Sequence, residues 1–325
     1  MLLLDDFWTW DFWIAKDEDT YHLFFLKAPK SLGDPNLRHG NARVGHAVGT
    51  DLRAWTVLDD ALAPGTDGAW DDLAIWTGST LFAEGRWHMF YTGINQREGG
   101  RHQRIGLATS EDLVTWTKHP EPVLTLDAEH YEGAVEGWPE IDWRDPWVYW
   151  SPEAERYRML FTARAPGGEV DERGVVGLAS STDLLAWTAE APMLAPQEFG
   201  HLEVPQLFEE AGRWYLSYSV YGERHSAKRR ASHAVETGTH YAVAPSESGP
   251  WTTLHPEFFC GGDGELYAGR FERDPQGKLV FLAFLQFVDG GPFVGGLSDP
   301  IPVTVEPDGR LSIVRAPLLV QEGAR

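Results

Sequence analysis

Three acidic residues stand among apolar neighbours at the start of strand-like segments of this 325-residue chain. They are Asp11 in TWDFWI, Asp145 in DWRDPWV and Glu203 in HLEVPQL. A carboxylate in an apolar setting is costly unless it is paired or hydrogen-bonded, which favours a functional reason for its presence. Two carboxyl groups that face one substrate can divide the chemistry, because one stays ionised as nucleophile or base while the other keeps a raised pKa and donates a proton. Cleavage of a glycosidic bond needs such a pair.

Each acid also has a structural interpretation. Asp145 follows Arg144, with which it could form an ion pair ahead of Pro146, and Asp11 could belong to a turn. The combination favours chemistry, because all three acids fall at the same position of a repeated unit. The third acid would hydrogen-bond sugar hydroxyls more strongly as an oxocarbenium-like transition state develops.

Aromatic and polar residues beside the acids complete a candidate sugar site. Flat aromatic faces suit the apolar faces of sugar rings, although packing inside the protein explains each single ring equally well. In addition to the three candidate catalytic acids, the residues expected to contact a substrate are Trp10, Trp13, Trp76, Ser79, Arg144 and Tyr267.

A repeated block indicates which elements position these residues. Three stretches are nearly identical, VGHAVGTDLRAWT (44–56), IGLATSEDLVTWT (105–117) and VGLASSTDLLAWT (176–188), and looser copies cover 241–253 and 294–305. Each copy follows two strand-like segments joined by a turn. Self-similarity at such a period indicates a repeat architecture, and radial repetition of four-stranded sheets is a β-propeller. The sequence therefore predicts an all-β fold, a five-bladed β-propeller with four antiparallel strands per blade.

The propeller explains why acids far apart in the sequence would meet. The first strand of each blade lines the central channel, so the starts of the five inner strands surround one mouth. The Trp of the repeated block is expected to pack between blades, and its Asp is expected to accept hydrogen bonds within its own turn. No Pro/Ser-rich linker or break in composition separates the repeats, so residues 1–325 are predicted to form a single domain.

Composition narrows the range of partners and cofactors. Lys and Arg number 27 against 49 Asp and Glu, a net charge of −22, so a nucleic acid partner is not expected. The His residues show no HExxH-type spacing, and no metal or other cofactor is predicted. The start MLLLDDFW is not a secretion signal, no apolar run is long enough to span a membrane, and Cys260 is the only cysteine. A cytoplasmic location is therefore expected, or an extracellular one if a signal has been removed.

The order of several short motifs resembles the catalytic domain of glycoside hydrolase family 32, which includes invertases, levanases and inulinases. The matching motifs are Asp11 ahead of Tyr21-His22-Leu23-Phe24, Gly45-His46-Ala47 before the Asp51–Trp55 turn, Thr77-Gly78-Ser79, Tyr91-Thr92-Gly93, Arg144-Asp145-Pro146, Glu203-Val204-Pro205 and Leu266-Tyr267-Ala268. Families 68 and 43 are more distant relatives with the same fold. The resemblance spans nearly the whole chain and implies a five-bladed propeller.

The resemblance also implies roles for the acids. Asp11 would be the nucleophile, Glu203 the general acid/base and Asp145 the transition-state stabiliser of a retaining glycosidase. Its substrate would be an oligosaccharide or small furanoside, with a fructoside as the first choice. The carboxyl groups of Asp11 and Glu203 would then lie about 5–5.5 Å apart, whereas about 6.5–9.5 Å would indicate inversion.

Several positions depart from the family's pattern. The Asn-Asp-Pro-Asn around the nucleophile is Trp10-Asp11-Phe12-Trp13 here, Leu26 stands in place of a Gln, Val44 in place of a Trp and Val204 in place of a Cys. Because these positions line the fructose pocket in the family, the chemistry could be kept while the bound sugar differs. The family's C-terminal β-sandwich is not expected, because only about 20 residues follow the last predicted blade.

Two other functions are alternatives. An inverting arabinofuranosidase or xylosidase similar to family 43 would be favoured by widely separated acids, or by a metal or water held in the channel by a histidine such as His46 or His240. A carbohydrate-binding propeller without catalysis would be favoured if Asp11 points away from the pocket.

Overall fold

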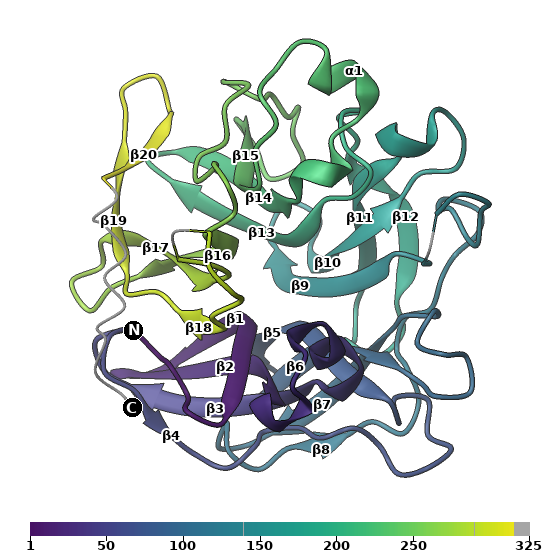
Figure 1. Ribbon diagram of the computed structural model, residues 1–325, viewed down its shortest axis with the longest axis vertical. Helices are drawn as coiled ribbons and strands as arrows, with labels where there is room; N and C mark the ends of the chain where they lie inside the picture. Colours follow the sequence, from purple (N-terminus) through teal and green to yellow (C-terminus); the bar gives the residue numbers. More distant parts are fainter. Residues whose placement is uncertain (139, 289, 315–325) are drawn as a thin grey trace.

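Five antiparallel sheets surround a central channel in the computed structural model, which describes residues 1–138, 140–288 and 290–314 (Figure 1). This arrangement is a five-bladed β-propeller and confirms the all-β fold predicted from the repeats. In each sheet the first strand lies nearest the channel, and the later strands follow outward. The first three sheets contain β1 (Phe7–Asp17), β2 (Thr20–Pro29), β3 (Arg43–Gly49) and β4 (Thr56–Val57); β5 (Ala74–Ala83), β6 (Arg86–Ile94), β7 (Arg104–Ser110) and β8 (Thr117–Lys118); and β9 (Trp143–Ser151), β10 (Arg156–Arg164), β11 (Gly174–Ser181) and β12 (Thr188–Leu194).

The last two sheets depart from the predicted four regular strands. In the described part of the chain the fourth sheet has three, because Val243 makes only an isolated bridge with Thr252, and the nearby Pro250 has no N–H to extend a ladder. In the fifth sheet two short strands share the third position, since both pair with the second strand. These sheets contain β13 (Glu203–Glu210), β14 (Arg213–Val220) and β15 (Gly238–Ala244); and β16 (Leu266–Arg273), β17 (Leu279–Leu285), β18 (Gly296–Leu297), β19 (Ile301–Val305) and β20 (Leu311–Ile313). The helices are η1 (Lys30–Leu32), η2 (Pro35–Asn41), η3 (Val170–Glu172), η4 (Gly222–Arg224) and α1 (Ala227–Arg230).

The repeated block forms the turn between the third and fourth strands of the first three blades. The carboxylate of Asp112 accepts hydrogen bonds of 2.9 and 2.7 Å from two backbone N–H groups of its own turn. The Trp116 ring lies 5.7 Å from that of Phe24, and the Trp187 ring 5.6 Å from that of Phe90, so each packs on the preceding blade. Both structural roles expected for the block are confirmed.

The ring of blades closes between the first and the last sheet. Leu2 and Leu297 exchange backbone hydrogen bonds of 3.0 and 2.8 Å, and the Thr9 N–H donates to the Gly295 carbonyl at 3.3 Å. The segment before β1 is therefore paired with the last blade, which holds the first inner strand beside the fifth.

Apolar side chains fill the space between blades. The strand β17 reads LVFLAFL and is buried along its whole length, since neighbouring blades cover both of its faces. Among the described residues, no helix combines the length and the apolar character that crossing a bilayer requires.

Candidate active site

All five inner strands carry a β-bulge near the same mouth of the channel. The pairing register of each inner strand shifts beside Asp11, Thr77, Asp145, Val204 or Ala268. Three of these residues also have a positive φ, 59° at Asp145, 53° at Val204 and 48° at Ala268, a conformation that is costly for non-glycine residues and clusters at functional sites. Because a bulge bends its strand and re-aims side chains, the bulges explain how the strand starts present polar groups to the mouth.

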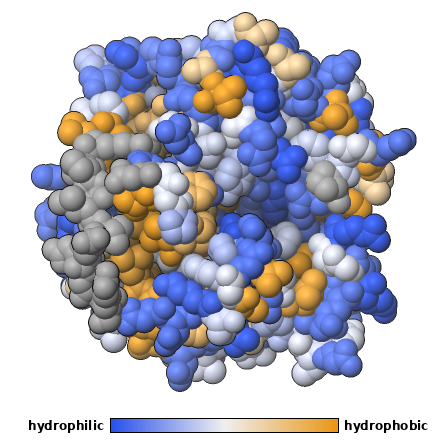
Figure 2. Space-filling view, in the orientation of Figure 1, coloured by the Kyte–Doolittle hydropathy of each residue, from blue (hydrophilic) through white to orange (hydrophobic). Residues whose placement is uncertain are grey.

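A cavity of about 340 Å³ lies at this mouth, where Figure 2 shows a hollow surrounded mainly by hydrophilic residues. Asp11, Asp145 and Glu203 all line it, so acids from the first, third and fourth blades converge. Four of the six expected substrate contacts also line the cavity, namely Trp10, Trp76, Arg144 and Tyr267.

The structure corrects the other two expected contacts. Trp13 is only 1% exposed, and its indole N–H donates to the Thr80 hydroxyl at 3.1 Å. The Ser79 hydroxyl is buried and accepts a hydrogen bond of 3.1 Å from the Val148 N–H. Both residues lie beyond the bulges, where neighbouring blades cover the strand. The polar residue of β5 that reaches the cavity is Thr77.

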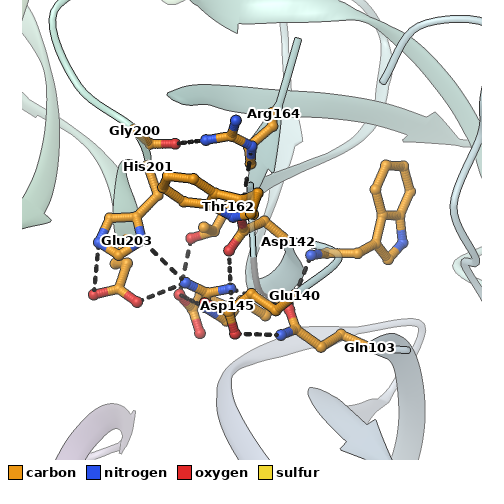
Figure 3. A network of polar contacts seen from close by, with 12 residues as sticks. Gln103, Glu140, Asp142, Asp145, Thr162, Arg164, Gly200, His201 and Glu203 are labelled. Atoms are coloured by element: carbon orange, nitrogen blue, oxygen red, sulfur yellow. Dashed lines mark hydrogen bonds and ion pairs between the residues drawn. The ribbon is translucent and has the colours of Figure 1, made fainter. Parts of the chain in front are cut away.

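Arg144 connects the acids of the third and fourth blades. Its guanidinium contacts the carboxylates of Asp142 and Glu203, the latter at 2.7 Å, and its Nε lies 3.7 Å from the Asp145 carboxylate. Figure 3 shows Asp142, Asp145 and Glu203 in one network of polar contacts. The side-chain oxygen of Gln103 accepts a further hydrogen bond of 3.2 Å. Burial alone would lower the pKa of Arg144, but the surrounding carboxylates outweigh it, so this side chain stays charged. The ion pair considered from the sequence is one part of a larger network.

Glu203 is held in its ionised form. Its Oε1 accepts from Arg144, and its Oε2 accepts from the Tyr267 hydroxyl at 2.5 Å. Burial would raise the pKa of Glu203, but His201, Arg144 and the hydrogen bond from Tyr267 outweigh it and lower this pKa to about 2. Because burial lowers the pKa of His201, that ring is neutral at pH 7, and Arg144 supplies the lasting positive charge.

Asp11 has the opposite electrostatics. Burial, followed by the negative charge of Asp145, raises the pKa of Asp11 to about 7 against the opposing hydrogen bond that the Thr77 hydroxyl donates. Below about pH 7 the pair of Asp11 and Glu203 therefore shares one proton, and the surrounding charges favour Asp11 as its carrier.

Two short helices supply cavity residues that the sequence analysis did not find. The helix η2 brings Arg38 to the cavity, and the Asp34 side chain caps its start by accepting from the Asn36 N–H at 2.9 Å. An Asp followed by a Pro is a helix-start signal, so the sequence could have predicted the helix η2. It could not have predicted that this helix lies over the mouth of the channel. The other lining residues not expected are His39, Thr77, Glu140, His201, Tyr221, Glu223, Arg224 and Phe284, whereas Leu26 lines the cavity as its place in the family pattern implied.

Glu140, Asp142 and His201 form a polar group beside Glu203. Their candidate ligand atoms lie within 4.8 Å of one another, a spacing that could hold a metal ion. Arg144 already contacts both carboxylates of the group, that of Glu140 at 3.9 Å, so its charge would oppose a cation there. The absence of a metal cofactor stays a prediction. Glu140 and Asp142 stand four and two positions before Arg144, and His201 stands two positions before Glu203. Alternate residues of an extended chain face the same side, so this spacing could have predicted that they lie near the acids.

Arg270 of β16 is a further buried cation close to the acids. It is 0% exposed, and its guanidinium donates to the carbonyls of Pro205 at 2.8 Å and of Val204 and Phe12 at 3.4 Å. It thus binds backbone groups at the bulge of the fourth blade and just after that of the first. No carboxylate lies within 4 Å of it among the described residues, so its charge acts on the acids from a distance.

Comparison with known proteins places this arrangement in a family. The sequence matches the glycosyl hydrolases family 32 N-terminal domain over residues 13–291. The chain belongs to glycosyl hydrolase family 32. The matched range contains Asp145 and Glu203, and Asp11 stands two residues ahead of it.

The curated relatives that the chain matches are distant and longer. The chain is 26% identical to the sucrose-6-phosphate hydrolase of Bacillus subtilis over 282 residues, which cover 83% of this chain and 53% of that protein. It is 28% identical to an insoluble β-fructofuranosidase isoenzyme of Arabidopsis thaliana over 58% of this chain and 32% of that protein. The chain therefore spans between about a third and about half of the length of these relatives.

Solved structures support the fold. An inulosucrase from Halalkalicoccus jeotgali bound to kestose superposes with a TM-score of 0.77 at 22% identity, covering 99% of this chain and 92% of that one. A Bacillus subtilis levansucrase superposes with a TM-score of 0.74 at 14% identity, covering 99% and 89%. At these identities the likeness concerns the propeller alone.

The departures from the family 32 pattern fall in two places. Trp10 and Leu26 line the cavity and oppose each other across the bulge of β1 and β2, so they alter the wall around Asp11. Val44 and Val204 are 0% and 2% exposed in the core cluster and do not line the cavity, which corrects the expectation for these two positions.

Proposed function

We propose that this chain is a glycosidase that cleaves fructosides with retention of configuration. The observation that carries the proposal is the convergence of three acids, each at or directly before the bulge of a different blade, around one cavity of a family 32 chain. A cavity of about 340 Å³ with aromatic rings and carboxylates in its wall suits one or two sugar units.

The proposed reaction divides the work among the acids. The Asp11 carboxylate attacks the anomeric carbon while Glu203 gives a proton to the glycosidic oxygen that leaves, so a covalent fructosyl ester forms on Asp11. Glu203 then takes a proton from water, which attacks the same carbon and releases Asp11. Asp145 accepts hydrogen bonds from sugar hydroxyls, and these bonds strengthen as positive charge develops on the ring.

The proton of the acid pair must move before this reaction. The pair holds one proton in either arrangement, but the environment favours it on Asp11, whereas the proposed mechanism needs it on Glu203. Arg144 and Tyr267 stabilise the charge on Glu203. We propose that substrate hydroxyls accept the hydrogen bonds of Arg144 and Tyr267 in place of Glu203. Glu203 then loses the donors that stabilise its charge, so its pKa rises and the proton moves to it from Asp11.

The reverse assignment is a second candidate, because the pKa values favour Asp11 as the acid and Glu203 as the nucleophile. Both assignments carry one proton and give the same pH dependence, so trapping must separate them. We would quench the enzyme during turnover of kestose, digest it, and find by mass spectrometry which peptide carries a fructosyl unit. An ester on Asp11 supports the proposal, and an ester on Glu203 reverses the roles.

A substrate test covers the activity itself. The purified chain is incubated with sucrose or kestose in the presence of methanol, and NMR identifies the methyl fructoside that forms. Methyl β-fructofuranoside indicates retention, whereas the α form indicates inversion. Absence of any sugar release from either substrate refutes a fructosidase.

The alternatives have less support from the cavity. His46 contacts His22 at 3.0 Å and stacks on Phe24, His240 stacks on Phe258, and neither histidine lines the cavity. Asp11 lines the cavity, which also disfavours a binding module without catalysis.

A further inference from the structure

His201 stands beside Glu203 and leaves one of its ring nitrogens unused. It precedes Glu203 by two residues, lines the same cavity and is 3% exposed. Between them Leu202 is 0% exposed and belongs to the core, so the alternation of an extended chain turns His201 and Glu203 to the same side. The Nε2 atom of His201 is buried without a hydrogen-bond partner and lies 3.5 Å from Glu203 Oε2 (Figure 3).

The backbone around His201 is anchored on both sides. The Gly174 N–H donates to the Phe199 carbonyl at 2.8 Å, and the Gly200 N–H donates to the Arg224 carbonyl at 2.7 Å. A Cβ atom on Gly174 would lie 2.5 Å from the His201 Cα, so the first residue of β11 packs directly against this backbone. These contacts hold the base of the His201 side chain in place.

Arg144 selects the tautomer of His201. Its Nη2 lies 3.5 Å from His201 Nδ1. A guanidinium has only donors, so Nδ1 is the acceptor, and the single proton of the neutral ring is on Nε2. Burial lowers the pKa of His201 and keeps the ring neutral. The group of His201 that faces Glu203 is therefore an N–H donor.

The proposed reaction leaves His201 as the remaining donor to Glu203. Arg144, Tyr267 and His201 are the side chains that contact Glu203 through hydrogen bonds or ion pairs in the described part of the chain. When substrate hydroxyls accept the hydrogen bonds of Arg144 and Tyr267, only His201 of these three still faces the carboxyl group. A buried N–H without a partner is unfavourable, and a movement of about 0.5 Å brings the two atoms to hydrogen-bond distance.

A hydrogen bond from His201 suits the protonated form of Glu203. In a carboxylic acid one oxygen carries the proton and the other accepts, so an accepting Oε2 leaves the proton on Oε1. The His201 donor is neutral and opposes protonation of Glu203 less than the charged Arg144 does. It can thus orient the acid without cancelling the rise of its pKa.

We propose that His201 is a positioning residue for the general acid. Its Nε2–H holds Oε2 of Glu203 once the substrate is bound, so that the protonated Oε1 faces the glycosidic oxygen. This inference rests on the proposed function for the role of Glu203, and it adds a residue that acts on the step in which the leaving group receives its proton.

Leaving-group dependence tests this role. The kcat/KM values for sucrose and for 4-nitrophenyl β-fructofuranoside both report the first bond cleavage. A sugar leaving group needs a proton from the general acid, whereas nitrophenolate departs without one. A misplaced general acid therefore slows sucrose cleavage and spares the aryl fructoside. Glu203→Gln, which removes the acid altogether, gives the largest difference between the two substrates.

Two variants of His201 differ only by a methylene group. The amide of His201→Gln reaches the place of Nε2 and still donates to Glu203, whereas that of His201→Asn reaches only the place of Nδ1. Asn should lower kcat/KM for sucrose by about tenfold to a hundredfold and change that for the aryl fructoside by less than about threefold, while Gln keeps most of both. The matched control is His88→Asn, at a buried histidine of β6 that does not line the cavity, and it should change neither value. Circular dichroism shows that each variant is folded.

Nitrogen NMR tests the tautomer without any substrate. In protein labelled with nitrogen-15 at histidine, the signals of His201 are assigned by their loss in His201→Gln. They should show a neutral ring with its proton on Nε2. A proton on Nδ1, or a ring that is charged at pH 7, would overturn the inference.

Two kinetic results would also overturn it. One is a His201→Asn variant that slows both substrates equally, which indicates a structural role. The other is a pair of Asn and Gln variants that behave alike on sucrose. The proposed function fails in a different way, when the wild-type protein releases no sugar from sucrose, kestose or the aryl fructoside although NMR finds the expected tautomer.

Discussion

Replacing Tyr267 with Phe tests how the cavity controls the proton of Glu203. The Tyr267 hydroxyl donates to Glu203 Oε2 at 2.5 Å, and the ring stacks on Tyr221 with a centroid distance of 4.0 Å. Phenylalanine keeps the stacked ring and removes only the donor. A hydrogen bond to an ionised group contributes about 1.5–3 kcal/mol, and one pKa unit corresponds to about 1.4 kcal/mol, so the pKa of Glu203 should rise by about one to two units.

The substitution Tyr267→Phe should move the acidic limb of the pH profile upward, because the two carboxyl groups of Asp11 and Glu203 must share one proton for activity. A hydrogen bond to the charged form lowers a pKa, so its loss raises the pKa of Glu203 from about 2 to about 3–4. The acidic limb of kcat/KM marks the loss of the singly protonated pair to the doubly protonated one, and it should move upward by the same amount. The basic limb near pH 7 follows the pKa of Asp11 and should stay where it is.

The assay is sucrose hydrolysis as a function of pH, with circular dichroism to confirm that the protein is folded at each point. The matched control is Tyr221→Phe, because Tyr221 lines the same cavity and its hydroxyl donates to Gln286 at 3.1 Å. An acidic limb in Tyr267→Phe that coincides with those of the wild type and of the Tyr221→Phe control would refute this account of Glu203. A shift of the basic limb alone would show that Tyr267 acts on Asp11.

Further substitutions distinguish residues needed for activity from residues needed for stability. Asp11→Ala and Glu203→Gln should each abolish sucrose hydrolysis without lowering the thermal unfolding temperature, and Glu203→Gln with most of its activity would refute its role. Asp145→Asn should lower kcat more than it raises KM in steady-state kinetics. Arg270→Gln should raise the pKa of Asp11 and move the basic limb upward by up to about one unit, since a nearby positive charge is lost, whereas Arg270→Lys should leave the limb in place. Trp187→Ala should reduce the free energy of unfolding by about 2–4 kcal/mol in urea titrations while activity per folded molecule is kept.

The sequence predicted the scaffold because its signals are local and repeated. The Trp and Asp of the repeated block recur at fixed offsets; the Asp makes its contacts within its own turn, and the Trp packs on the preceding blade. The register of the inner strands followed from that repetition, which is why the convergence of Asp11, Asp145 and Glu203 was predictable. The sequence did not predict that the fourth blade has only three strands among the described residues, because the repeated block there matches the other copies poorly and Pro250 interrupts it.

The wall of the cavity was harder to predict, because it depends on bulges and on loops between blades. A bulge changes which side chain reaches the mouth by one or two residues, and this explains why Thr77 takes the place expected for Ser79. The residues of η2 and η4 come from connections that do not repeat. A buried Arg38 has no periodic signal, because its position is set by the packing of Trp10 and Phe293 around it.

The hydrogen bonds of the three acids explain why Glu203 is the group to perturb. Asp145 Oδ2 accepts from the Thr162 hydroxyl at 2.8 Å and from the Val204 N–H, freed by its bulge, at 3.1 Å, while no hydrogen bond among the described residues uses Oδ1. Asp11 likewise accepts from Thr77 through Oδ2, and no hydrogen bond of the described residues uses its Oδ1. Glu203 alone has both oxygens engaged by protein donors. In the proposed mechanism a direct contact with a glycosidic oxygen requires Glu203 to give up one of these partners, and the loss of that partner raises the pKa of Glu203 in the direction that proton donation needs.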